Sequence, residues 1–161
     1  MIPQAAAILA AMLAAPAPQD TLPADPFQRV AVKIAQGHIH AHGWQRDAYA
    51  RGLAAGVTAD RRFLLTSYYG TEPDGRVDRY GRTCTLRTAA SNRLPRRAYI
   101  WTRYGLRQVL DCGARSNDRR ADRAGCDAWC DYWMPTARQA RKAGLDGWTP
   151  AQGAVIPNDL H

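Results

Sequence analysis

Lysine is scarce in this sequence, and it contains no apolar run long enough to cross a membrane. Lys33 and Lys142 are its only lysines, although the net charge is +8 over 161 residues, so arginine carries nearly all of the positive charge. A genome rich in G and C favours arginine through its codons alone. The other explanation is an anionic partner such as nucleic acid, a charged cell surface or a cell-wall polymer.

Patterns typical of nucleic-acid binding are also missing. The sequence has no RNP-like, helix-turn-helix or zinc-finger motif, and its arginines are not gathered on one element among aromatic residues. They are spread along the chain, as at Arg29, Arg51, Arg61, Arg76, Arg93, Arg107, Arg123 and Arg138. We therefore expect no nucleic-acid partner.

The N-terminal segment resembles a signal peptide in some respects. The apolar run from Ala5 to Ala15 has the length of a signal-peptide hydrophobic region and is too short to span a bilayer. No lysine or arginine precedes this run, and Pro18 follows Ala17 at the expected cleavage junction. We expect residues 1–26 to be a signal-like or disordered segment. We also expect export to the periplasm, the cell envelope or the medium; the alternative is a disordered Ala/Pro tail.

All four cysteines lie in the C-terminal half of the chain. They are Cys84, Cys112, Cys126 and Cys130. An even number of cysteines in an exported protein favours one or two disulfides, and three pairings are possible. A zinc site needs two closely spaced pairs of ligands, and Cys126 with Cys130 supplies only one. Disulfides are therefore the stronger prediction.

Three histidines alternate near the N-terminal end. His38, His40 and His42 would share one face of an extended strand, where they could bind a metal. However, no acidic residue or cysteine is nearby, and glycines at positions 37 and 43 flank the group. We expect an exposed loop here, and we predict neither a metal nor another cofactor.

The chain before residue 62 has helical patterning. Apolar positions recur at helical spacing over residues 27–36 and again from 45 to about 62. We interpret residues 27–61 as an N-terminal helical adjunct to the domain that follows.

Short strand-like stretches dominate the remainder. They are residues 62–70, 83–88, 98–102, 107–112 and 153–157. Residues 72–75 have turn chemistry, and residues 113–126 suggest a long polar loop. A helix should begin after Pro135 with Thr136 as its N-cap and should end at Gly144. Several short strands with one late helix predict a small β-barrel.

Two aspartates stand at the edges of apolar runs. Asp111 follows Val109-Leu110, and Asp131 precedes Tyr132-Trp133-Met134. A carboxylate at such a border loses part of its hydration, and two carboxylates brought together raise the pKa of one of them. That group can then serve as an acid, so the pair suggests bond cleavage. Asp127 is a rival for the same role, while Asp118 and Asp122 suggest solvated loop charges.

The order of several short segments resembles a known family. The segments are Ser67-Tyr68-Tyr69-Gly70, Ala89-Ala90-Ser91-Asn92-Arg93-Leu94-Pro95, Ala98-Tyr99-Ile100-Trp101, Leu110-Asp111-Cys112-Gly113, Asp131-Tyr132-Trp133-Met134-Pro135-Thr136-Ala137 and Gly153-Ala154-Val155-Ile156. Together they resemble the 3D (three-aspartate) domain and the rare lipoprotein A-like domain. The resemblance covers about residues 62–157. It implies a mainly β fold: a six-stranded double-psi β-barrel with short helices.

Such domains are similar to membrane-bound lytic transglycosylase A and to cell-wall resuscitation factors, which cut peptidoglycan glycan strands. By position, the resemblance assigns the acid/base role to Asp131 and makes Asp111 its neighbour. Ser91-Asn92 occupies the place of the third family aspartate. Candidate substrate-binding residues are Tyr68, Tyr69, Asn92, Trp101 and Trp133, because sugar rings stack on exposed aromatic side chains.

The resemblance leaves three functions open. The first is a glycan-cleaving enzyme of the lytic-transglycosylase type acting on peptidoglycan. The second is a non-catalytic barrel that binds peptidoglycan or a partner protein, which the missing third aspartate favours. The third, disfavoured by the scattered arginines, is a basic nucleic-acid-binding protein. An enzyme requires the carboxyl groups of Asp111 and Asp131 to face one groove within about 10 Å.

Overall fold

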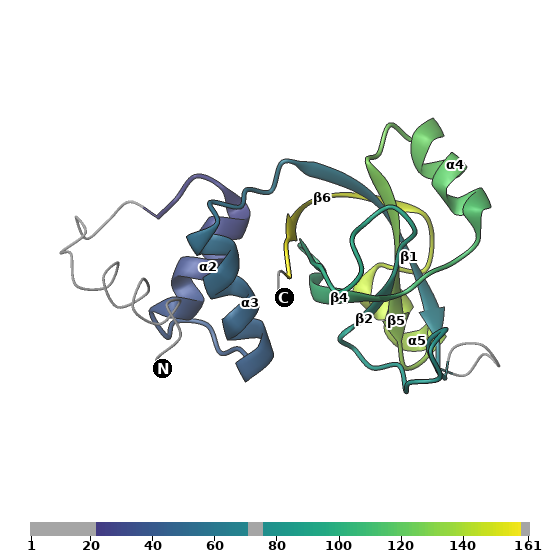
Figure 1. The fold of residues 1–161 in the computed structure, drawn as a ribbon, viewed down its shortest axis with the longest axis horizontal. Helices are drawn as coiled ribbons and strands as arrows, with labels where there is room; N and C mark the ends of the chain where they lie inside the picture. The colour runs from purple at the N-terminus through teal and green to yellow at the C-terminus, as the bar shows by residue number, and fades with distance from the viewer. Residues whose placement is uncertain (1–21, 71–75, 159–161) are drawn as a thin grey trace. The chain divides into compact units, whose positions relative to one another are not determined.

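The computed structural model describes residues 22–70 and 76–158, and the chain forms two compact units, Met1–Ala59 and Asp60–His161 (Figure 1). The signal-like run and the turn at residues 72–75 lie outside the described residues. None of the helices that the structure describes is long and apolar enough to cross a membrane.

The first unit contains the helices α2 (Pro26–Ala35) and α3 (Gly43–Ala54). Asp25 caps α2, because its Oδ1 accepts a hydrogen bond from the Gln28 backbone N–H at 2.9 Å. Its Oδ2 accepts another from the Ala59 N–H at 2.8 Å, which fixes the end of this unit. The second helix was expected to reach residue 62. It ends eight residues earlier, and Gly56 follows with a left-handed φ of 64°.

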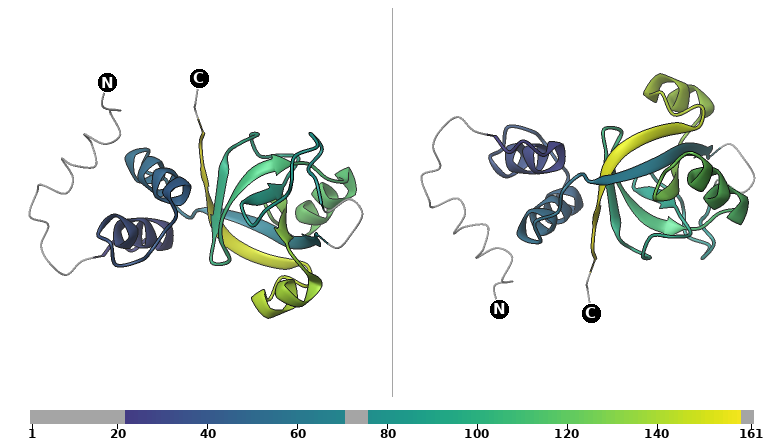
Figure 2. Two further views of the ribbon diagram at one scale, coloured as in Figure 1. Left: turned by 90° about the horizontal axis from the view of Figure 1, so that it is seen from below. Right: turned by 90° about the horizontal axis from the view of Figure 1, so that it is seen from above.

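The second unit is a closed six-stranded β-barrel (Figures 1 and 2). The strands are β1 (Arg61–Tyr69), β2 (Thr88–Ala90), β3 (Tyr99–Thr102), β4 (Gly105–Asp111), β5 (Ala128–Met134) and β6 (Thr149–Ile156). Around the barrel they follow the order β1-β5-β2-β4-β3-β6. The expected small barrel is confirmed. "Mainly β" is too loose, because the described helices and strands contribute about equally.

The barrel has an internal two-fold pattern. Its two parallel pairs are β1 with β5 and β2 with β4, and all other neighbours are antiparallel. Exchanging β1, β2 and β3 for β4, β5 and β6 reproduces every pairing and its direction. The chain therefore interlocks two similar three-stranded halves.

Side chains alternate between the two faces of β1 and β5. One set builds the main core, which includes Phe63, Leu65, Cys130 and Tyr132. The other set lies on the outer wall, where Leu64 and Trp129 pack with Ala121 of α4 (Arg115–Arg123). Figure 2 shows α4 outside the barrel. The same alternation places Thr66, Tyr68, Asp131 and Trp133 on the outer face.

Several local predictions are settled by these elements. Thr136 caps α5 (Ala137–Ala143) by accepting from the Gln139 N–H at 3.2 Å, and Gly144 ends that helix with a φ of 74°, as expected. The long loop over residues 113–126 was wrong, because α4 occupies most of it. The strand over residues 83–88 was also wrong, because β2 begins only at Thr88.

Candidate functional site

The register of three strands brings Asp111 and Asp131 close together. Ala90 in β2 pairs with Asp131 of antiparallel β5 on one side and with Asp111 of parallel β4 on the other. The β2–β4 ladder shifts register between Ala89 and Ala90, so Asp111 and not Leu110 stands opposite Ala90. Two strand spacings place the two aspartate Cα atoms about 10 Å apart. The two aspartates therefore flank Ala90, one on each neighbouring strand.

Asp131 is held by a short relay of hydrogen bonds. The Trp129 indole Nε1–H donates to Thr66 Oγ1 at 2.8 Å, and the Thr66 hydroxyl donates to Asp131 Oδ1 at 2.8 Å. Because the indole can only donate, it leaves the threonine hydroxyl to donate to the carboxylate. This relay fixes the orientation of Asp131 on the barrel wall.

Asp111 is held by the backbone of two segments. Its Oδ1 accepts from the Cys112 N–H at 2.8 Å and from the Arg79 N–H at 3.1 Å. Its own carbonyl accepts from the Ser91 N–H at 3.1 Å, which continues the β2–β4 pairing by one bond. The carboxylate therefore joins the end of β4 to the loop between β1 and β2.

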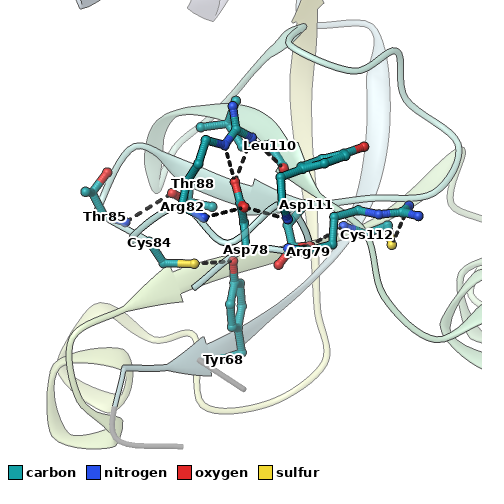
Figure 3. Close-up of polar contacts among 11 residues, drawn as sticks. Tyr68, Asp78, Arg79, Arg82, Cys84, Thr85, Thr88, Leu110, Asp111 and Cys112 are labelled. Atoms are coloured by element: carbon teal, nitrogen blue, oxygen red, sulfur yellow. Dashed lines mark hydrogen bonds and ion pairs between the residues drawn. The ribbon is translucent and has the colours of Figure 1, made fainter. Parts of the chain in front are cut away.

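Asp78 organises that loop (Figure 3). Its side chain is 5% exposed, its Oδ1 accepts from the backbone N–H groups of Tyr80 and Arg82, and its Oδ2 accepts from Arg82 Nε at 2.7 Å. Burial acts to raise the pKa of Asp78, but the hydrogen bonds from Arg82 and Tyr80 and the Arg82 charge together lower it. The Arg82 guanidinium also donates to the Leu110 carbonyl at 3.3 Å. The loop is thus fixed against the strand that carries Asp111.

Tyr68 extends from β1 toward this loop, as Figure 3 shows. Its hydroxyl hydrogen-bonds with Cys84 Sγ at 3.7 Å. Burial, then that hydrogen bond, and then the negative charges of Cys84, Asp111 and Asp131 raise the pKa of Tyr68 far above its usual value. The Tyr68 hydroxyl therefore stays protonated at neutral pH.

A groove of about 580 Å³ adjoins Asp111. It is lined by Arg79, Tyr80, Ser91, Asn92, Arg93, Leu94, Arg96, Val109, Leu110, Asp111, Cys112, Gly113, Arg115 and Asp118. Its volume lies in the usual range of small-molecule sites. Asp131 is not among the lining residues, so only Asp111 of the two aspartates lines the groove.

The predicted aromatic residues divide into two groups. Trp133 is the register partner of Tyr68, and these two side chains share the outer face with Asp131. Tyr69 is next to Tyr68 along β1 and therefore projects to the opposite face. Trp101 is buried in β3 and pairs with Leu106, about 17 Å along β4 from Asp111. The structure thus brings two of the four aromatics to the aspartates.

Ser91 and Asn92, at the position of the third aspartate of the resembling family, make hydrogen bonds within the protein. Ser91 Oγ donates to the Trp129 carbonyl at 2.7 Å. Asn92 Oδ1 accepts from the Gly113 N–H at 3.1 Å, and its amide nitrogen donates to Asp118 Oδ2 at 3.0 Å. A side chain at Gly113 would collide with the Trp129 ring. Asn92 therefore joins the turn after Asp111 to α4 at the floor of the groove.

The rival Asp127 has a structural role, and Asp118 and Asp122, expected in a loop, lie in α4. Asp127 Oδ2 accepts from the Arg62 N–H at 2.7 Å, where β1 begins. Asp122 of α4 makes two hydrogen bonds with Arg93, at 2.5 and 2.8 Å. The interpretation of Asp118 as a solvated loop charge was wrong, because its side chain is 15% exposed and lies in α4.

The cysteines are unpaired in the structure. Cys84, Cys126 and Cys130 are buried, and Cys112 is partly exposed. Burial raises the pKa of the Cys130 thiol strongly. Cys112 Sγ accepts from the Arg79 guanidinium at 2.9 Å. The structure therefore contains no disulfide. The described residues also contain no group of three metal-ligating side chains, and His38, His40 and His42 lie between and at the edge of the two N-terminal helices.

Two residues that hold the candidate site in place, Thr66 and Asp78, were not predicted from the sequence. Thr66 carried no local signal, because its contact with Asp131 depends on a pairing between residues 65 positions apart. Asp78 did carry one, since an aspartate three residues before a glycine is typical of a side-chain-stabilised turn, and Gly81 has a left-handed φ of 76°.

Comparison with known proteins identifies no matching family model, no matching curated protein and no matching solved structure.

Proposed function

We propose that this chain cleaves the glycan strands of peptidoglycan by a lytic-transglycosylase-like reaction. The observation that carries the proposal is the register that sets Asp111 and Asp131 on either side of Ala90. Glycosidic cleavage needs paired carboxylates beside a sugar-sized groove. Asp111 lines such a groove and Asp131 does not, so the proposal requires the glycan to extend beyond the groove to reach Asp131. The proposed place of action is the cell envelope, outside the cytoplasm.

The barrel topology supports a relationship to the 3D domain. A double-psi barrel consists of two interlocked halves, each contributing to a parallel strand pair. The exchange of β1–β3 for β4–β6 reproduces this pattern in full. The finer assignment to the double-psi class therefore rests on topology together with the ordered segments of the sequence.

In the proposed reaction Asp131 is the acid and then the base. Its protonated carboxyl group donates a proton to the leaving glycosidic oxygen as the bond from that oxygen to the anomeric carbon breaks. The sugar's own 6-hydroxyl then attacks the anomeric carbon, and its proton returns to Asp131. The product is an anhydro ring, and no water is consumed. Thr66 holds the carboxyl group, while Asp111 contacts the sugar beside it.

Zymography on purified peptidoglycan tests these roles. Wild-type protein should clear the gel, and Asp131→Asn should reduce clearing about 100-fold or more, because an amide cannot supply the proton. Asp111→Asn should cause a smaller reduction of about tenfold, because only a neighbouring charge is lost. Asp146→Asn, at an exposed position away from the barrel wall, is the matched control and should clear like wild type.

Absence of clearing by folded wild-type protein would contradict the proposed enzymatic function. Clearing that survives both Asp131→Asn and Asp111→Asn would instead contradict the catalytic roles proposed for these two residues. Asp127→Asn distinguishes the remaining rival, since its carboxylate only accepts a backbone hydrogen bond and its loss should leave clearing intact.

One observation favours a non-catalytic barrel as the second candidate. Asn92 occupies the place of the third family aspartate, and both ends of its amide are bound within the protein. In that case the chain would bind peptidoglycan or a partner protein without cutting. Retention of wild-type protein on insoluble peptidoglycan, with no soluble fragments released over the same time, would identify this function.

A further inference from the structure

The groove beside Asp111 is rich in arginine. Four of its lining residues are arginines, Arg79, Arg93, Arg96 and Arg115, while only Asp111 and Asp118 carry negative charge there. These arginines come from the β1–β2 loop, the segment between β2 and β3, and the start of α4. Because these arginines are far apart in the sequence, the sequence alone did not show that they form one positively charged site.

Only one of the four arginines has an acidic partner. Arg93 makes two hydrogen bonds with Asp122 and approaches Asp118 at 3.9 Å. Within residues 22–70 and 76–158, neither Arg79 nor Arg96 nor Arg115 has a carboxylate within ion-pair distance. The positive charge that they bring to the groove is therefore not neutralised by the protein.

Tyr80 arranges two of these guanidinium groups. The Arg96 guanidinium lies over the Tyr80 ring with its carbon 3.8 Å from the centroid, and that of Arg79 lies 5.4 Å away. Stacking of a guanidinium on an aromatic ring leaves the N–H groups at its edge available, in the fork that matches a carboxylate. Arg79 is fixed further by its bond to Cys112 Sγ.

Asp118 supplies the opposite kind of group. Its Oδ1 is buried and has no hydrogen-bond partner, while its Oδ2 is held by Asn92. Buried polar atoms are rarely left unsatisfied, because each costs free energy when it is removed from water. Asp118 lines the same groove as the arginines, and its Oδ1 faces Arg93 Nε at 3.9 Å.

From these observations we infer that the groove binds a peptide carried by the glycan strand, and not the sugar chain alone. A short peptide offers carboxylates to Arg79, Arg96 and Arg115, the three groove arginines that have no acidic partner among the described residues. A nucleic-acid backbone fits less well, because Asp111 and Asp118 in the groove lining would repel a continuous row of phosphates. The inference rests on the proposed action on peptidoglycan and names the part of the substrate that the enzyme recognises.

Binding to glycan strands immobilised on beads tests the inference without cleavage. Full-length Asp131→Asn protein is mixed with peptide-bearing peptidoglycan, with strands stripped of peptide by an amidase, or with peptidoglycan whose carboxylates are blocked as amides. Stripping leaves a carboxylate on each muramic acid, so this arm separates a peptide carboxylate from a sugar carboxylate. We expect binding to be about tenfold weaker to both treated polymers.

Substitution of the groove arginines should act in the same way. Adding Arg96→Gln and Arg115→Gln should weaken binding to peptide-bearing polymer about tenfold and leave binding to stripped strands unchanged. Both side chains are exposed, and neither makes an ion pair within the described chain, so the fold should be kept. The control pair Arg138→Gln and Arg141→Gln removes the same charge from exposed positions on α5 and should change binding less than about twofold.

Equal binding to stripped and peptide-bearing polymer would overturn the inference, and so would equal losses from the groove and control pairs. Loss of binding to a DNA duplex, with peptidoglycan binding kept, would assign the groove to nucleic acid instead. The two proposals fail separately. If the protein binds peptide selectively but never clears a zymogram, only the proposed cleavage is contradicted. If it cleaves peptidoglycan but shows no preference for peptide, only the assignment of the groove is contradicted.

Discussion

At the scale of single residues, one tyrosine on the outer face of the barrel, Tyr68, has a strongly raised pKa. Tyr68 shares its face with Asp131 and reaches toward Asp111, and its hydroxyl contacts a buried thiol. The Tyr68 hydroxyl is therefore neutral at neutral pH and is engaged with Cys84 Sγ. The oxidation state of the four cysteines shows directly whether disulfides stabilise the barrel.

Thiol reactivity checks that state. The four cysteines are unpaired, and only Cys112 is partly exposed. Purified protein should therefore show one thiol that reacts rapidly with an aromatic disulfide reagent and three that react only after unfolding. Cys112→Ser should abolish the rapid phase and leave three slow thiols. Fewer than four reactive thiols in unfolded, unreduced wild-type protein would contradict the account and restore the disulfides that the sequence favours.

At the scale of elements, the β1–β2 loop determines where Asp111 lies. Asp78 closes this loop on itself, Arg82 ties it to the Leu110 carbonyl, and the Arg79 N–H binds Asp111. The loop is thus fixed to the end of β4 beside the groove. Its stability depends on one buried carboxylate.

Replacing Asp78 by asparagine should lower the free energy of unfolding by about 1–2 kcal/mol at pH 7, because the ion pair between the buried Asp78 carboxylate and the partly exposed Arg82 guanidinium is broken. The pKa of Asp78 is lowered in the folded protein, from 3.8. Its contribution is therefore complete above the unfolded value and is lost as the pH falls through the folded value. Urea denaturation of wild type and Asp78→Asn should show a constant difference from pH 5 to 7 that shrinks below about pH 4. A difference that does not depend on pH would contradict the ion pair.

The same scale shows what local sequence patterns could predict. The Thr136 cap and the Gly144 stop defined α5, and apolar runs placed β1, β3, β4 and β6. The pattern missed α4, because its residues are almost all polar and Ala121 is the only one it buries. It also missed most of β2, a three-residue strand that exists only through its pairing with β4 and β5.

The site was predictable only in part for the same reason. Asp111 and Asp131 could be named because each borders an apolar run and matches a segment of the resembling family. The groove arginines could not be grouped, because Arg79, Arg96 and Arg115 meet only after the barrel closes. Local patterns carry no information about such long-range contacts.

At the scale of the whole barrel, the interlocked halves explain how the two aspartates meet. Both belong to the second half, on β4 and β5, and β2 of the first half passes between them. Neither half alone could place the two aspartates on either side of Ala90. The closed barrel therefore supplies the support for the site, and the groove lies beside Asp111.

The most direct test of the proposed cleavage is the chemistry of the released fragments. Purified peptidoglycan is digested with wild-type protein or Asp131→Asn in water enriched in oxygen-18, and the soluble fragments are analysed by mass spectrometry. Wild type should release fragments that end in an anhydro ring and carry no heavy oxygen, and Asp131→Asn should release almost none. Fragments that carry heavy oxygen at a reducing end, or equal release by the two proteins, would contradict the account.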